Sequence, residues 1–527
     1  MLFLSLPGII CAKSVAYTPV SWQRLDLKLN GIGVGIELPN KVLLVSLGDG
    51  FISPTHYDAV FNYQLDSPAA FTFSVNSGYS FAINGTPIQN GSNFRFTGIK
   101  YGSIVPLQRY FNGSLIDTYS ILFTNLPVME LRTARTPTDT KSPSLIRLMS
   151  GKFNQDTGFL QNSAIQLRWG DVTQSYPKLS YTFTAGGKNA YYPTGKAIQL
   201  LDMRKTLEWT LNAVYRDKSY ARNLVSYDIY RDLQGKANVG LNGQSEARGH
   251  LIEVIQNGVY QGIYSLEETI DQHLLDLKPV TVPLVNGKTV WNQVDFTKPE
   301  NGSVLYRAKI GQSVFYDALS VQTNFEQIYP NSKAIDRWQP LVELTNFVAN
   351  ASDQEFIAGI GNRIDIDSFV DWWLLIEVSR ASDNIKKNFY LAKNGGGKFF
   401  IVPWSHQASF GMDWEGTPYS ASRWPTDWSD TDENKLIHRL LTLPATGFNT
   451  KLKVRWNALR SEAASNLIAR FEGYLNQSKL GGAKTRDLFT WPDSNHNDNV
   501  DSIAVISDFI KARVGLVDTI INKLPEK

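Results

Sequence analysis

The sequence lacks the features that define several common classes of protein. Cys11 is the only cysteine in 527 residues, which excludes an intramolecular disulfide framework. Lysine and arginine total 52 and aspartate and glutamate total 49, so the formal charge is only +3 and no block of like charge stands out. Binding to nucleic acid or to an anionic membrane surface therefore has no electrostatic basis. No stretch approaches the about 20 apolar residues that a transmembrane helix needs.

Residues 1–16 are predicted to be a signal peptide, although one part of the pattern is missing. An apolar stretch from Leu2 to Cys11 is followed by Ser14-Val15-Ala16, which resembles a small-residue cleavage site. The basic residues that normally precede such a stretch are absent. An apolar first strand is the alternative interpretation.

The distribution of charged residues divides the chain near residue 125. Only 13 of the first 125 residues are Asp, Glu, Lys or Arg, against 88 of the remaining 402. The first stretch carries alternating runs such as FTFSVNSGYSFAI between turn residues, which is typical of short antiparallel strands. Because the chain is too long for one hydrophobic core, we expect a small β-sandwich-like domain over 17–125 and a second domain over 126–527.

The second domain is predicted to be α+β with a helical C-terminal half. Strand patterns such as QLRW come first, and helical patterns follow at 220–233, 365–381 and 448–475. A last helix is expected to start near Asp501, because apolar residues recur at helical spacing beyond it.

Two pairs of residues in this domain are candidates for binding phosphate. Arg168 and Lys178 lie in a strand-rich stretch, and an enzyme uses arginine as a planar fork and lysine as a point charge to hold a polyphosphate. Arg222 and Asn223 begin a predicted helix whose N-terminal amides are able to hold an anion. For Arg168 and Lys178 the alternative is a solvated position on a strand.

Glu267 and Glu268 follow two alternating strands that flank Asn257-Gly258, the strongest short hairpin signal. In kinase-type sites a carboxylate orients the lysine that binds phosphate. Capping of a helix is the alternative role for at least one of the two glutamates.

Asp383 and Asn388 are spaced as a catalytic pair for phosphoryl transfer. In kinases an aspartate accepts the proton of the substrate hydroxyl, and an asparagine a few residues later holds a metal ion. The D-x4-N spacing across a loop between a helix and a strand meets that need, although the pattern is short.

Four segments taken together resemble the CotH spore-coat kinase family. They are MRKTLEWTLNAVYRDKSYARNLVSYDIYRDL, IEVIQNGVYQGIYSLEETI, DIDSFVDWWLLIEVSRASDNIKKNFYL and FFIVPWSHQASFG. The resemblance implies an atypical protein-kinase-like fold and, in active members, phosphorylation of protein serines with ATP and Mg²⁺ or Mn²⁺. It makes Asp383 the catalytic-loop aspartate and Asn388 a metal ligand. It also places Asp217, Arg222 and Asn223 in the family's D-x-S-x-x-R-N segment, and gives Glu267 or Glu268 the place of the acidic residue after the G-x-Y strand.

The sequence departs from this family at its metal site. Active members have a Pro-Trp-Asp-x-Asp segment, and the two aspartate places are Ser405 and Gln407 here. Mg²⁺ prefers carboxylates, and loss of one charge at 4 Å costs about 4 kcal/mol at an effective dielectric near 20. If that interaction is made in the transition state, the rate falls by about three powers of ten. Asp413 is the one nearby carboxylate and therefore the candidate to replace the lost ligands.

Two hypotheses follow from these observations. The first is a secreted or cell-surface pseudokinase that serves as a binding or structural component, with a protein partner or a glycan as ligand. The second is an active ATP-dependent protein serine/threonine kinase of secreted or surface proteins. Tryptophans 372, 373 and 404 are expected in the core, whereas the group at 414, 424 and 428 is either core or ligand-facing.

Overall fold

The computed structural model describes most of the chain after residue 98. It covers residues 25–29, 32–33, 35–38, 42–46, 62–63, 69–73, 78–89, 93–94, 96, 99–133, 135–150, 161–168, 175–185, 197–237, 246–309, 313–422, 433–492 and 498–526. The predicted signal peptide, Trp424 and Trp428 lie outside these residues. The chain forms two compact units, each built from three segments. Unit 1 comprises 1–215, 249–268 and 473–496, and unit 2 comprises 216–248, 269–472 and 497–527.

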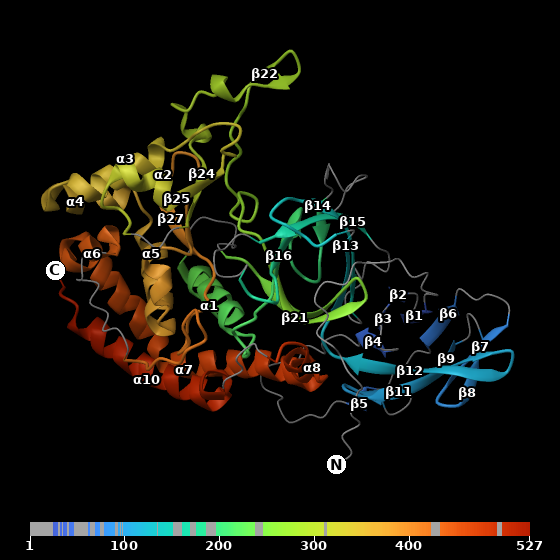
Figure 1. The fold of residues 1–527 in the computed structure, drawn as a ribbon. Coiled ribbons are helices and arrows are strands. Elements are labelled where there is room, and N and C mark those ends of the chain that lie inside the picture. The colour runs from blue at the N-terminus through green and yellow to red at the C-terminus, as the bar shows by residue number, and fades with distance from the viewer. Residues whose placement is uncertain are drawn as a thin grey trace. The chain divides into compact units, whose positions relative to one another are not determined.

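The N-terminal part of unit 1 consists of short strands (Figure 1). A six-stranded sheet has the order β3(Gly35–Leu38), β4(Val42–Ser46), β12(Ser114–Thr124), β11(Ile104–Phe111), β7(Tyr79–Ile83) and β8(Thr86–Ile88). A four-stranded sheet has the order β2(Ile32–Gly33), β1(Leu25–Leu29), β6(Ala69–Phe73) and β9(Asn93–Phe94), and β10(Ile99–Lys100) pairs with β5(Asn62–Tyr63). This confirms a β-rich N-terminal region. The sandwich arrangement and the domain boundary at 125/126 stay predictions, and that boundary falls between β12 and the next strand, inside unit 1.

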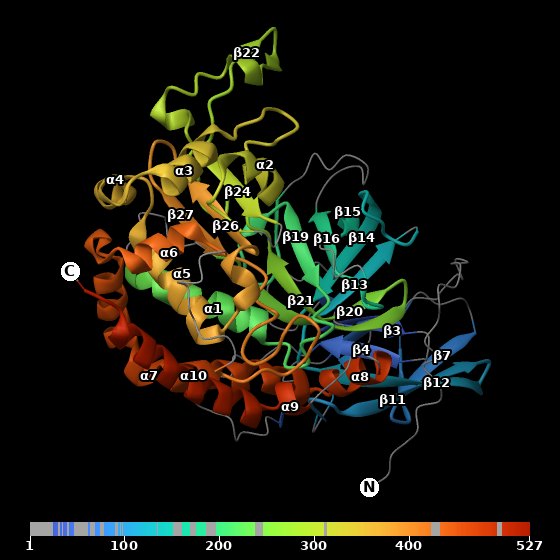
Figure 2. The ribbon, with the colours of Figure 1, turned by 60° about the vertical axis from the view of Figure 1, so that its left-hand side comes forward.

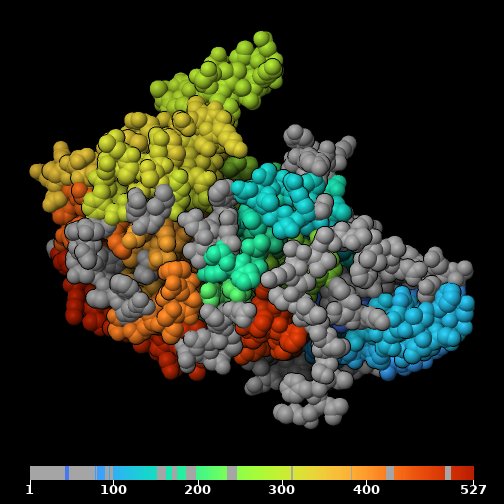
Figure 3. Space-filling model, viewed as in Figure 1, coloured from blue at the N-terminus to red at the C-terminus, as the bar shows by residue number. Residues whose placement is uncertain are grey.

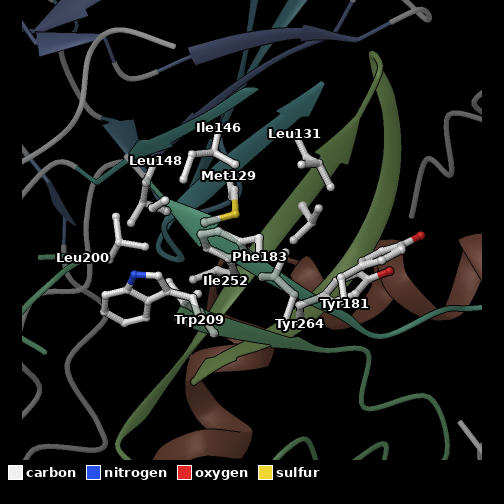
Figure 4. Packing of buried hydrophobic residues seen from close by; sticks show 14 of the residues in the cluster. Met129, Leu131, Ile146, Leu148, Tyr181, Phe183, Leu200, Trp209, Ile252 and Tyr264 are labelled. Atoms are coloured by element: carbon white, nitrogen blue, oxygen red, sulfur yellow. The ribbon is translucent and has the colours of Figure 1, made fainter. Parts of the chain in front are cut away.

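The central part of unit 1 is a closed barrel of seven strands. Its order is β13(Val128–Thr133), β14(Ser142–Met149), β15(Gln161–Leu167), β16(Tyr181–Ala185), β19(Glu208–Asn212), β21(Val259–Glu268) and β20(Gly249–Gln256). The parallel pairing of β13 with β20 closes it, so no edge strand is left exposed. Side chains at alternate strand positions fill the interior, as Figure 4 shows for Met129, Ile146, Phe183, Trp209 and Ile252.

Strands β20 and β21 form the hairpin that the sequence predicts. Asn257 and Gly258 adopt φ angles of 51° and 80°, the left-handed pair that a two-residue type I′ turn requires. The Asn257 side chain also accepts a bond from the Thr133 amide at 2.9 Å and donates to the Thr133 carbonyl at 3.1 Å. The hairpin turn is therefore fixed both by its backbone and by a contact with β13.

Unit 2 combines one small sheet with many helices (Figures 1 and 2). The sheet has the order β25(Phe325–Tyr329), β24(Val304–Ala308), β26(Phe389–Lys393) and β27(Phe399–Pro403). The helices include α1(Arg222–Ala237), α3(Gln339–Asn350), α4(Asp353–Gly359), α5(Ile366–Ser379), α6(Lys435–Thr442), α7(Phe448–Leu480), α9(Asp498–Asp501) and α10(Ile503–Lys523). The helical C-terminal half is thus confirmed. The last turns of α7 belong to unit 1, as does the following α8(Ala483–Thr490).

Helix ends in unit 2 follow local sequence signals. Asp365 caps α5 by accepting a bond from the Asp367 amide at 3.2 Å, and Asn434 caps α6 in the same way at the Ile437 amide. The last long helix begins after Ser502, whose hydroxyl accepts from the Val505 amide. Side-chain oxygens that accept from free amides of a first turn are the usual N-caps.

Helix α5 is apolar on nearly all sides and is correspondingly buried in unit 2. Trp372 and Trp373 on this helix are completely buried, and Trp404 after β27 is 7% exposed, so the prediction that these three belong to the core is confirmed. Trp414 is 50% exposed. A hairpin of β22(Leu284–Val285) and β23(Lys288–Thr289) projects from the rest of unit 2, as the space-filling view shows (Figure 3). No described helix is long and apolar enough to cross a bilayer.

Candidate functional site

The loops that flank β26 and β27 in unit 2 carry the predicted catalytic residues. The backbone at Arg380, Asn388, Ser405 and Phe410 adopts φ angles between 46° and 59°, in the left-handed region. This conformation costs an L-residue roughly 1–2 kcal/mol, and asparagine tolerates it best. Such outliers persist only where surrounding contacts fix them, and they concentrate at functional sites.

Asn384 joins the two loops. Its side-chain amide donates to the Trp404 carbonyl at 2.9 Å and to the carbonyls of Asn388 and Ser405 at 3.4 Å. The Trp404 amide in turn donates to the Asn388 carbonyl at 3.0 Å. The structure therefore brings Asn388 and Ser405 together, as the sequence analysis expects. Asn384 itself was not identified from the sequence, because a buried asparagine that bonds only to carbonyls leaves no motif.

Asp383 lies in the short 3₁₀ turn Ser382–Ile385, between α5 and β26. Its carboxylate is 3.1 Å from the Lys387 ammonium, and both side chains are 32% exposed. Asp383 is thus accessible from solvent, and its charge is paired with that of Lys387 four residues later in the chain.

Asp413 is bound within its own turn. One carboxylate oxygen accepts the amides of Glu415 at 3.0 Å and Thr417 at 2.8 Å. A metal ion at this oxygen would compete with both hydrogen bonds. Asp413 therefore has a turn-forming role in this structure, and its role as a metal ligand stays a prediction.

Arg222 is the centre of a buried ionic cluster at the start of α1. Its guanidinium is completely buried and lies 2.5 Å from Asp217 and 3.0 Å from Asp501. It also donates to the Ser409 carbonyl at 3.0 Å and to the Val500 carbonyl. Burial alone lowers the pKa of Arg222, but the two carboxylates outweigh that effect and raise it.

The predicted anion position at the N-terminus of α1 holds a carboxylate of the chain itself. The Arg222 amide donates to Asp217 at 3.0 Å, and the same carboxylate accepts the Ser219 amide at 3.1 Å. Asn223 is also used internally, since its side-chain oxygen accepts the His406 amide at 2.8 Å. Arg222, which binds the Ser409 carbonyl, and Asn223 thus position the loop that contains Ser405 and Gln407.

His406 is completely buried, whereas its two neighbours in the chain, Ser405 and Gln407, are half-buried. Neither ring nitrogen has a hydrogen-bond partner among the residues that the structure describes. Burial lowers the pKa of His406 to about 3, so the imidazole is neutral at physiological pH. Within the described ranges, no three His, Cys, Asp or Glu side chains are grouped so that they could hold a metal ion.

The other predicted phosphate-binding residues belong to unit 1. The Lys178 ammonium is completely buried, 2.6 Å from the Asp487 carboxylate, and it donates to the Ile263 carbonyl at 2.5 Å. It also lies 4.7 Å from the centre of the Tyr264 ring. Asp487 is 309 residues further along the chain, so no local pattern could have identified it as the partner.

Glu267 and Glu268 both lie in β21, so the alternative that one of them caps a helix is wrong. The Glu267 carboxylate accepts a bond from the Asn212 side chain at 3.1 Å, and Glu268 accepts the Arg204 amide at 2.8 Å. Arg168 follows β15, and its amide donates to the Ser180 carbonyl at 2.9 Å. The contacts of Glu267 and Glu268 fix the end of β21 against neighbouring parts of the barrel, and the roles of Arg168, Lys178, Glu267 and Glu268 toward a nucleotide stay predictions.

Comparison with known proteins points to one family. The family model described as CotH kinase protein matches residues 165–517. Inner spore coat protein H of Bacillus subtilis (strain 168) is 24% identical over 219 residues, which cover 41% of this chain and 54% of that protein. The chain thus spans about half the length of the curated relative that it matches.

Proposed function

Because the chain belongs to the CotH kinase protein family, we propose that it is a kinase-type protein whose phosphotransfer site is impaired and which acts as a binding or structural component. The observation that carries the proposal is the pair Ser405 and Gln407. Both are neutral, and they stand where the family pattern has two aspartates. Mg²⁺ and Mn²⁺ favour carboxylate ligands, so this loop offers them little.

The surroundings of Asp413 and His406 support the same conclusion. Asp413 accepts two amides within its own turn, so recruiting it as a ligand would cost those hydrogen bonds. His406, between the two neutral residues, lies in a fully buried environment that favours the uncharged imidazole. The Asp413 carboxylate is thus already used within its turn and His406 is uncharged, so neither residue replaces the two carboxylate ligands.

The site retains residues that favour the second candidate function, an ATP-dependent protein kinase. Asp383 is accessible, and Asn388 lies beside the Ser405 loop through the Asn384 hydrogen bonds. In an active enzyme Asp383 would accept the proton of a protein serine, and Asn388 would hold one Mg²⁺ or Mn²⁺ ion, which neutralises the phosphates of ATP. Arg168, Lys178, Glu267 and Glu268 would be the nucleotide-binding group of that enzyme.

Location and partners are part of the proposal. The similar Bacillus protein is named an inner spore coat protein, which supports a surface location and a protein partner for this chain. The exposed Trp414 supports a contact with such a partner or with a glycan.

Calorimetry with ATP and Mg²⁺ or Mn²⁺ tests the impaired site. We expect no metal-dependent nucleotide binding by the native chain, and measurable metal-dependent binding when Ser405→Asp and Gln407→Asp are combined. The matched control is Ser420→Asp with Ser422→Asp, two exposed serines of the same segment, which should change nothing. Transfer of labelled phosphate by the native chain that disappears in Asp383→Ala would establish the kinase instead.

A further inference from the structure

A cavity of about 110 Å³ lies among three helices of unit 2. Helices α1, α5 and α7 run close together in both ribbon views (Figures 1 and 2). The cavity walls are apolar and mostly buried, and they include Leu233, Leu374, Leu375, Phe410, Trp456 and Leu467. The polar lining residues Asp232 and Asn466 are exposed, which places the mouth between α1 and α7.

The wall chemistry selects an uncharged ligand. The indole nitrogen of Trp456 already donates to Asp518 at 2.9 Å, so it is not available to a ligand. An engineered apolar cavity of roughly 150 Å³ stays dry and binds benzene. The cavity in this protein is of the same order and, with its open mouth, has room for one ring or one branched alkyl group.

The mouth disfavours anions. Arg470 is the cation there, and it pairs with Asp232 and lies 3.6 Å from Asp228. Asp228 also pairs with Arg231, so two carboxylates face two guanidiniums, which leaves no net positive charge for the head group of a carboxylate ligand. A fatty acid or an aromatic acid would find no excess positive charge at the point where its own charge must sit.

Phe410 connects this cavity to the loop that carries Ser405 and Gln407. Its amide donates to the Ser379 carbonyl at 2.7 Å, and its ring packs edge-on against Phe471 of α7 with 4.9 Å between ring centres. The preceding residue, Ser409, donates to the His406 carbonyl and accepts a bond from Arg222. A ligand that contacts the Phe410 ring therefore acts on a backbone that hydrogen bonds fix at Phe410 and at Ser409.

We propose that the cavity among α1, α5 and α7 binds a small uncharged aromatic or branched alkyl compound, and that its occupancy stiffens the loop 404–413 through Phe410. This inference does not depend on whether the protein binds nucleotide. It requires only that a ring of matching size is more favourable between the apolar walls than water is.

Titration with toluene, followed by heteronuclear NMR and by thermal unfolding, tests the binding. Toluene is expected to raise the unfolding temperature in a saturable way, and benzoate, the same ring with a carboxylate, is expected to bind at least tenfold more weakly. Ala463→Leu, which adds a side chain to the cavity wall, should weaken toluene binding at least tenfold. The matched control Ala458→Leu, at an exposed position of the same helix, should bind as the native chain does.

Hydrogen exchange of amides 405–411 tests the connection. Exchange is expected to slow when toluene saturates the native chain and to remain unchanged in Ala463→Leu at the same toluene concentration. If Ala463→Leu does not fold, Leu467→Ala serves instead, because a larger cavity should shift preference from toluene toward p-xylene. Equal binding of toluene and benzoate, or toluene binding that Ala463→Leu leaves intact, would overturn the site. Unchanged exchange at saturation would overturn the coupling.

Discussion

Arg222 illustrates how much of unit 2 depends on single buried charges. Its guanidinium neutralises Asp217 and Asp501 while its remaining donors reach two carbonyl groups. Removal of one partner of a buried ion pair leaves the other charge without compensation, which typically costs 3–5 kcal/mol. Arg222, a candidate for phosphate binding from its sequence, holds the loop at Ser409 in this structure.

Arg222→Met is therefore expected to lower the free energy of unfolding by about 3–5 kcal/mol, because two buried carboxylates lose their counter-ion. Urea denaturation followed by circular dichroism measures the change. The control is Arg460→Met, which breaks an exposed pair with Asp518 and should cost about 1 kcal/mol or less. A loss below 1 kcal/mol in Arg222→Met would contradict the role of this cluster.

His406 predicts a dependence of stability on pH. Its pKa falls from 6.5 in the unfolded chain to about 3 in the folded protein, because burial disfavours the imidazolium. The folded state then binds fewer protons than the unfolded state between these values, so the stabilisation is complete above pH 6.5 and is lost as the pH falls toward 3. At pH 5 the loss from this residue amounts to roughly 2 kcal/mol.

Denaturant titrations at pH 7 and pH 5 provide the measurement. The native chain should lose roughly 2 kcal/mol more over this interval than His406→Leu, which cannot take up the proton. His273→Leu, at an exposed position, should keep the native pH dependence. An identical pH dependence in the native chain and in His406→Leu would rule out a neutral buried imidazole.

At the scale of single elements, the hairpin turn before β21 provides a clear test. Asn257→Ala places a Cβ-bearing residue without a polar side chain in the left-handed region and removes three hydrogen bonds to Thr133, so we expect a loss of about 2 kcal/mol. Asn257→Gly keeps the favourable backbone and loses only the bonds, so its cost should be about half as large. Thermal unfolding distinguishes the two, and equal losses would show that the φ angle contributes nothing.

Elements were predictable where the signal is local. The Asn257-Gly258 turn, the Ser502 cap and the apolar length of α5 all act within a few residues, and the structure has each of them. The αL conformations of Ser405 and Phe410 were not predictable, because distant contacts impose them against the local preference. Likewise, nothing near Lys178 indicates Asp487, and nothing near β13 indicates its parallel pairing with β20.

At the candidate site, the same difference between local signals and distant contacts separates what was predictable from what was not. The spacing of Asp383 and Asn388 and the neutral pair Ser405 and Gln407 are visible in the sequence itself. The anion at the N-terminus of α1 is the carboxylate of Asp217, only five residues before Arg222, whereas Asp501 and Ser409, which also bind the guanidinium, come from distant parts of the chain. Without those distant contacts the same residues would fit a phosphate. Residue type indicates which ligands a site could bind, whereas the contacts of the folded chain decide whether another residue of the protein already takes that place.

On the scale of the whole molecule, each compact unit is assembled from three separate segments. A fragment of residues 1–215 contains five of the seven barrel strands but lacks β20, β21 and Asp487. We expect it to aggregate or remain unfolded, because two barrel edges are exposed and the buried Lys178 has lost its carboxylate. Size-exclusion chromatography and circular dichroism test this directly.

Co-expression with residues 216–527 should restore a soluble complex, since that piece supplies both missing segments. An internal control is the fragment 1–268, which contains all seven strands and should be more soluble than 1–215 while still lacking Asp487. A folded, monomeric 1–215 fragment would contradict the interdependence of the segments.

The pairing of Lys178 with Asp487 also has a consequence for the protein during its synthesis. When Lys178 is added to the nascent chain, 309 residues remain to be translated before its carboxylate partner exists. At roughly 5–20 residues per second this takes on the order of 15–60 seconds. Throughout that interval a nascent barrel would hold an unneutralised ammonium, so unit 1 matures only near the end of translation, and chaperones that shield emerging chains have a defined window in which to act.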